Sequence, residues 1–132
     1  MLPRLLLDTH VAVRWLIEAK RLSREQVRVL ERAVRHTEPV ALSCISLLEI
    51  AVLTSEGKLK LPLNDFFEEL HANPLFRILP LTYEIASEVA SLGNSLRDPA
   101  DRVIVATARV HRLRLVTSDQ RITESKLVPV VG

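Results

Sequence analysis

The sequence predicts an α/β protein: a three-layer α/β/α sandwich around a four- to five-stranded parallel sheet, formed by a single domain over residues 1–132. Two observations support this fold class. Short apolar segments alternate with helical segments along the chain, and most of the apolar segments have no polar face, which is typical of parallel strands covered on both sides. In addition, 48% of the residues are hydrophobic and only 3 are glycine, so the chain can bury a sizeable core.

The first third of the chain predicts a strand followed by two helices. Residues 4–7, RLLL, form a short apolar run that ends directly at Asp8, as a buried parallel strand would. A helix is expected over residues 9–19. A second helix should begin at Ser23-Arg-Glu-Gln26, which is a capping box.

The middle of the chain predicts a second strand, two helices and a third strand. Residues 40–44, VALSC, form the strand, and the following helix runs through SLLEIAVLTSEG, where Gly57 can terminate it. A short amphipathic helix is expected over residues 64–72. The third strand is FRILPL, residues 76–81, and Pro80 places it at a strand end or a sheet edge.

The last third of the chain predicts two helices and two strands. A helix is expected over residues 83–93, and a second one over residues 99–111. Asp98 is a suitable N-cap for this second helix, and Pro99 suits its first position. The two strands are predicted over residues 113–119 and 126–131.

Acidic residues occur where strands end and helices begin. They are Asp8, Glu49, Asp98, Asp101 and Asp119. In a parallel sheet these junctions lie at one edge, where ligands of open α/β sheets bind. The sequence therefore predicts that distant segments bring carboxylates into one crevice.

Each acid also has a simpler interpretation as a helix cap. SLLE, which ends at Glu49, fits a capping box. Glu49 has apolar neighbours on all sides, however, and Asp101 precedes an apolar run. A carboxylate in such surroundings needs a partner. A hard divalent cation would relieve the repulsion between several carboxylates, and Mg²⁺ prefers such oxygen ligands.

Other classes of protein and site have little support in the sequence. The single cysteine, Cys44, excludes an internal disulfide and favours a reducing compartment. No apolar run is long enough to span a membrane, so we expect a cytoplasmic protein. The net charge of +2 is too small to indicate nucleic-acid binding, although arginines are frequent in the last third of the chain. The histidines show no metal-ligand spacing.

Four segments resemble, in order, the motifs of PIN-domain ribonucleases of the VapC toxin type: LLLDTHVAVRWL, SLLEIAVLTSEGKLKL, RDPADRVIVATA and LVTSD. The resemblance spans essentially the whole chain. It implies a Mg²⁺- or Mn²⁺-dependent endoribonuclease that cleaves single-stranded regions of RNA. Leu48 and Leu96 depart from the tryptophan and histidine that the family often has there, but neither replaces a metal ligand.

The resemblance also implies roles for individual residues. The catalytic and metal-binding acids would be Asp8, Glu49, Asp101 and Asp119. Polar residues that contact and orient these acids would be Thr9, Ser46 and Thr117, whereas Asp98 would either cap its helix or contact the metal or a water molecule. Arginine and lysine residues at the rim of the crevice would bind phosphates.

Partners follow from the same resemblance. It implies a cognate antitoxin and a homodimer, with no membrane association. The apolar residues around the helix at 9–19, including Trp15, would form a partner surface or be buried within the fold. Two other functions stay open: a non-catalytic RNA-binding or regulatory module, and a phosphotransferase with Asp8 as its nucleophile.

Overall fold

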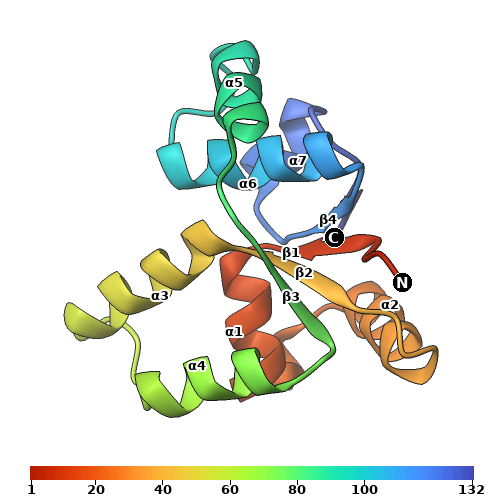
Figure 1. The fold of residues 1–132 in the computed structure, drawn as a ribbon, viewed down its shortest axis with the longest axis vertical. Coiled ribbons are helices and arrows are strands. Elements are labelled where there is room, and N and C mark those ends of the chain that lie inside the picture. The colour runs from red at the N-terminus through yellow and green to blue at the C-terminus, as the bar shows by residue number, and fades with distance from the viewer.

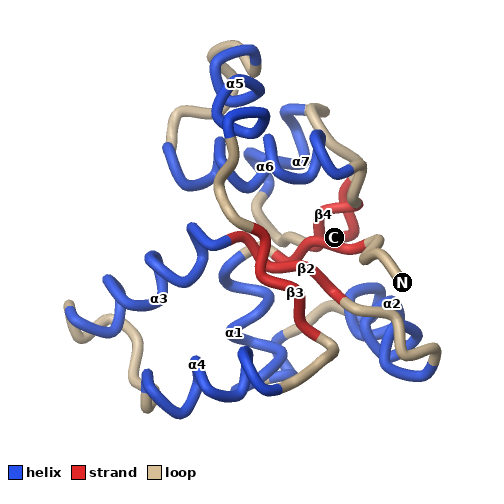
Figure 2. Tube along the Cα trace, viewed as in Figure 1, coloured by secondary structure: helices blue, strands red, loops and turns tan.

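The protein is described by a computed structural model of residues 1–132, which contains a five-stranded parallel sheet between two layers of helices (Figures 1 and 2). The strands are β1 (Leu5–Leu7), β2 (Val40–Ser43), β3 (Phe76–Leu79), β4 (Arg114–Val116) and β5 (Val130–Val131). The α-helices are α1 (Thr9–Ile17), α2 (Arg24–Arg35), α3 (Cys44–Ser55), α4 (Leu63–Ala72), α5 (Tyr83–Ser91), α6 (Pro99–His111) and α7 (Gln120–Ser125). A short 3-10 helix, η1 (Ala19–Arg21), follows α1. The predicted fold class is confirmed.

The strand order β3-β2-β1-β4-β5 places β1 at the centre of the sheet. Leu6 pairs with Ala41 of β2 on one side and with Leu115 of β4 on the other. The chain thus builds outward from β1 to β3, then returns to the opposite side of β1 for β4 and β5. Such a reversal opens a crevice at the carboxyl ends of the two strands that flank it, here β1 and β4.

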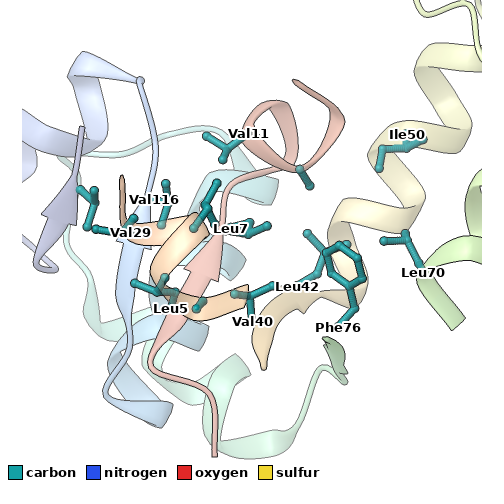
Figure 3. Close-up of a cluster of buried hydrophobic side chains, with 14 of the residues drawn as sticks. Leu5, Leu7, Val11, Val29, Val40, Leu42, Ile50, Leu70, Phe76 and Val116 are labelled. Atoms are coloured by element: carbon teal, nitrogen blue, oxygen red, sulfur yellow. The ribbon is translucent and has the colours of Figure 1, made fainter. Parts of the chain in front are cut away.

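Alternate side chains of β1 enter two separate cores. Leu5 and Leu7 pack with α1, α2 and α4 in one core (Figure 3). Leu6 packs in the other core with residues of α5, α6 and α7. In Figure 1, α5, α6 and α7 lie together on one side of the sheet. Both faces of the sheet are therefore covered, which explains why its strands are apolar throughout.

Trp15 is partly buried and packs against one of the two cores. Its ring meets that of Phe76 edge to face, with 5.8 Å between the ring centroids. Val11 and Ala12 of the same helix are fully buried. Most apolar residues of α1 thus pack within the fold, although Val13, Trp15 and Leu16 are only partly buried and Ile17 at its end is exposed.

Several predicted boundaries were wrong. α3 begins at Cys44, with Ser43 as its N-cap, so Ser46 is not the cap that the SLLE segment suggested. The predicted strand over 113–119 pairs only at Arg114–Val116, and α7, which was not predicted, begins at Gln120. Its six residues are too few for an apolar period to be visible in the sequence. None of the helices is both long and apolar enough to cross a membrane.

Candidate active site

Four carboxylates from separate elements line one cavity at the carboxyl edge of the sheet. Its volume is about 480 Å³. Asp8 follows β1 directly, Asp119 lies shortly after β4, Glu49 belongs to α3 and Asp101 to α6. We call Asp8, Glu49, Asp101 and Asp119 the acid cluster. The strand order thus brings together acids that are far apart in the sequence.

Asp8 is held in place by hydrogen bonds to both of its carboxylate oxygens. It is the N-cap of α1, and its Oδ1 accepts from the backbone N–H of Thr9 at 2.8 Å. Its Oδ2 accepts from the hydroxyl of Thr117 at 2.6 Å. The same hydroxyl oxygen accepts from the backbone N–H of Asp119 at 3.1 Å. Thr117 therefore fixes the position of Asp8 relative to the turn that carries Asp119.

Glu49 is held by a chain of hydroxyl groups. Thr9 Oγ1 donates to Glu49 Oε1 at 2.5 Å and lies 2.8 Å from the hydroxyl oxygen of Ser46. A hydroxyl has a single proton, so Ser46 donates to Thr9 while Thr9 donates to Glu49. Because α3 begins at Cys44, Glu49 lies in its second turn, where it cannot complete a capping box. The capping interpretation of Glu49 is therefore wrong.

The two aspartates at the start of α6 have different roles. Asp98 is the N-cap, and its Oδ1 accepts from the backbone N–H of Asp101 at 3.1 Å. The Asp98 side chain lies outside the main cavity, next to Asp101 and Arg121 in a smaller one. Asp101 instead lines the main cavity, and its side chain is only 15% exposed. The helix thus uses one carboxylate as a cap and presents the other to the acid cluster.

Two carboxyl groups of the acid cluster, those of Glu49 and Asp101, have raised pKa values. Burial, together with the charges of Asp98, Asp8 and Asp119, raises the pKa of Asp101 to about 6. Burial also raises the pKa of Glu49, partly opposed by its hydrogen bond from Thr9. Burial is the larger cause of both shifts, and the neighbouring carboxylates add to it because like charges disfavour ionisation.

Arg121 is the cation nearest to the acid cluster. Its guanidinium lies 3.0 Å from Asp119 Oδ2 and 3.8 Å from Asp101 Oδ2. The hydrogen bonds from Arg121 lower the pKa of Asp119. Because the Arg121 side chain is 73% exposed, it can leave this position without disturbing the core.

The donor chemistry of the acid cluster fits a hard divalent cation. The candidate ligands are carboxylate oxygens, which Mg²⁺ prefers, and Mg²⁺ needs only one or two of them because it retains water ligands. As they stand, no three acidic, histidine or cysteine side chains are placed so that they could hold a metal ion together. Thr9, Thr117 and Arg121 hold individual carboxylates of the cluster. The residues therefore fit the ion by their chemistry and by lining one cavity, and their side chains would have to move closer together to bind it.

His10 is a site residue that sequence reasoning missed. Its Nδ1 lies 3.3 Å from Asp8 Oδ2, and its Nε2 accepts from the backbone N–H of Ser118 at 3.1 Å. The imidazole therefore carries its proton on Nδ1 and directs it at Asp8. Its position two residues after Asp8, in the first turn of α1, was the only signal in the sequence.

The arginines that are frequent in the last third of the chain do not line the main cavity. Arg102 donates to the backbone carbonyls of Val89, Gly93 and Leu96 and so joins α5 to α6. Arg109 pairs with Glu88. The arginine and lysine residues that line the main cavity come from earlier in the chain: Arg14, Arg21 and Lys60.

Comparison with known proteins finds relatives in both sequence and fold. The family model described as PIN domain matches residues 5–126. Ribonuclease VapC22 of Mycobacterium tuberculosis is 36% identical over 120 residues, covering 89% of this chain and 88% of the relative. The crystal structure of FitAcB from Neisseria gonorrhoeae has a chain that is 27% identical, with a TM-score of 0.71 and coverage of 97% of this chain and 96% of that one. A toxin-antitoxin complex from Klebsiella pneumoniae, 23% identical, shares the fold with a TM-score of 0.63 over 96% of this chain and 95% of that one.

Proposed function

Because this chain belongs to the PIN-domain family and is a relative of a VapC ribonuclease, we propose that it is a metal-dependent endoribonuclease and the toxin of a toxin–antitoxin pair. The observation that carries the proposal is the acid cluster, in which four carboxylates line a single cavity. The substrate would be a single-stranded region of RNA, cleaved to leave a 5′-phosphate and a 3′-hydroxyl.

The proposed cofactor is Mg²⁺ or Mn²⁺, held by Asp8, Asp101 and Asp119. When bound, such an ion polarises the phosphate and makes water a stronger nucleophile at neutral pH. Thr117 would keep Asp8 oriented for this role, and displacement of Arg121 would free Asp119. Burial and the neighbouring charges of Asp98, Asp8 and Asp119 raise the pKa of Asp101, and the contribution of these negative charges supports a cation at this place.

Glu49 would either join the metal ligands or orient the attacking water. Its Oε1 is held by Thr9, which leaves Oε2 to accept a proton from water. Its raised pKa suits a group that takes up a proton during the reaction. Thr9 and Ser46 would fix the direction in which this carboxylate points.

The partners we propose are an antitoxin and a second copy of the chain. The shared fold with a chain of a toxin–antitoxin complex supports the first. Large apolar side chains remain exposed on α3, at Leu48 and Val52, and around the start of α5, at Leu81 and Tyr83. Apolar surface of this kind is typical of protein interfaces.

A phosphotransferase that uses Asp8 as its nucleophile has less support. Asp8 is 5% exposed, and each of its carboxylate oxygens already accepts a hydrogen bond. A nucleophile needs a free oxygen aimed at the substrate. The surroundings of Asp8 suit a fixed ligand better than an attacking group.

The test is cleavage of a labelled single-stranded RNA with Mg²⁺, Mn²⁺ or EDTA, with the product ends mapped. Glu49→Gln should fold like the parent but lose cleavage by orders of magnitude, because an amide accepts no proton from water. Asp98→Ala is the matched control: it should lose about 1 kcal/mol of stability as a missing N-cap and keep most of the activity. Cleavage by Glu49→Gln at the parent's rate would contradict the proposal, and RNA binding without cleavage in any metal would favour the non-catalytic module.

A further inference from the structure

The cavity that contains the acid cluster changes character along α1. At the start of the helix its wall is acidic. Farther along, the lining residues are mostly apolar or basic, with one carboxylate among them: Val13, Arg14, Ile17, Glu18, Arg21, Leu53, Leu59 and Lys60. In Figure 1, α1 runs away from the sheet, with α3 on one side of it and α4 near its far end. The cavity thus joins an acidic end to a basic, partly apolar end.

Two cations at the basic end have no partner within the protein. Arg21, which also lines the cavity, faces Glu18 at 3.8 Å, so these two charges largely cancel. Arg14 and Lys60 take part in none of the protein's ion pairs. Arg14 is partly buried and shares its cavity with several carboxylates, yet it pairs with none of them. Its guanidinium is therefore available to an anion from outside.

The spacing along α1 relates this anion position to the acid cluster. Arg14 lies four residues after His10, on the same face of the helix, which is about 6 Å along its axis. His10 in turn contacts Asp8. A separation of one helical turn is comparable with the distance between neighbouring phosphates of an extended nucleic-acid strand.

We propose that Arg14 and Lys60 bind the RNA phosphate next to the scissile one, while Val13, Ile17 and Leu53 contact the nucleoside between the two. This inference rests on the proposed function. A guanidinium can bind a phosphate with two parallel hydrogen bonds. The acid cluster repels phosphate unless a cation intervenes, so the basic end is the part of the cavity that binds RNA independently of metal. It would also set the direction in which the strand crosses the site.

The test measures RNA binding without cleavage. A short fluorescein-labelled single-stranded RNA of mixed sequence is titrated with the protein in EDTA, from about 50 to 200 mM salt, and fluorescence anisotropy gives the affinity. Removing both cations that bind this one phosphate, with the double variant Arg14→Ala/Lys60→Ala, should lower the log–log salt slope by about 0.7 and weaken binding roughly tenfold. The matched control is Arg24→Ala, which removes an exposed, unpaired arginine outside the cavity. It should change neither quantity.

Because Arg14 and Lys60 have no ion-pair partner, the double variant should melt at the parent's temperature, and circular dichroism checks this. An unchanged salt slope, or no salt-dependent RNA binding by the parent, would overturn the proposal. Unchanged RNA binding with weakened antitoxin binding would also overturn it and assign the basic end to the protein partner. If the parent cleaves no RNA but the slope falls as expected, the nuclease proposal fails and the phosphate site stands. If the parent cleaves RNA but the double variant has an unchanged salt slope, the phosphate site fails and the nuclease proposal stands.

Discussion

Replacing Asp101 with asparagine should stabilise the folded protein at neutral pH in the absence of divalent cations. The pKa of Asp101 is about 6 in the folded protein, against an ordinary value of 3.8. Between these two values the folded protein binds more protons than the unfolded chain does. Stability therefore falls as the pH rises through this interval and stays low above it. An asparagine side chain has no proton to lose, so the variant lacks this fall.

The size of the effect follows from the pKa difference. The two values differ by about 2 units, and each unit corresponds to about 1.4 kcal/mol, which sets an upper limit near 3 kcal/mol. Arg121 lies 3.8 Å from the carboxylate and neutralises part of its charge, while some solvent reaches the group. We therefore expect a gain of about 1 to 2 kcal/mol for Asp101→Asn.

Urea unfolding in EDTA across this pH interval measures the effect. The difference in unfolding free energy between Asp101→Asn and the parent should be small near pH 4, grow as the pH rises, and become constant above about pH 7. Asp98→Asn is the control. Asparagine caps a helix as well as aspartate does, and the substitution removes one of the charges that raise the pKa of Asp101. It should show part of the same gain. A difference that is absent at pH 8, or that does not change with pH, would refute the electrostatic account of the acid cluster.

Three further predictions concern the metal and the interior. Mn²⁺ or Mg²⁺ should raise the melting temperature, with about 2.7 kcal/mol of stabilisation at an ion concentration of one hundred times Kd. Asp119→Asn should remove most of this response. An unchanged melting temperature of the parent with either ion would contradict the shared metal site. Gln26→Leu should lower the unfolding free energy by about 1 to 3 kcal/mol, since it removes the buried amide that donates a hydrogen bond to Ser118. An unchanged urea midpoint would contradict a stabilising role for this hydrogen bond. Trp15→Ala should cost about 2 to 3 kcal/mol through lost contact with Phe76; unchanged stability with weaker antitoxin binding would make Trp15 an interface residue instead.

The positions of most strands, and of the acids beside them, could be predicted from sequence because both signals are local. Leu5 to Leu7 form an apolar run that stops at a carboxylate, and the structure keeps that order. The order of the strands could not be predicted in this way. Nothing near Leu6 in the sequence indicates that β4, from the far end of the chain, becomes its neighbour.

The different roles of similar residues also could not be predicted from the sequence. Asp98 and Asp101 belong to one motif, and only the geometry of the helix start separates the cap from the cavity-lining acid. His10 looked like an ordinary helix residue because its second contact, Ser118, is distant in the sequence. In the sequence Arg121 is one of several C-terminal arginines, and only the fold shows that it lies beside Asp101 and Asp119. For His10 and Arg121 the missing information was the identity of a partner that is distant in the sequence.

The helix N-termini at the cavity help to stabilise the closely spaced carboxylates of the acid cluster. Helices α1 and α6 both begin at this edge, with Asp8 and Asp98 as their N-caps and Asp101 in the first turn of α6. The aligned peptide dipoles of a helix give its first turn a partial positive charge, which stabilises a nearby anion by roughly 0.3 to 1 kcal/mol. Two helix macrodipoles therefore oppose the mutual repulsion of the carboxylates. The backbone thus supplies some of the compensating charge itself, so the chain can fold with its acids already gathered and before a cation arrives.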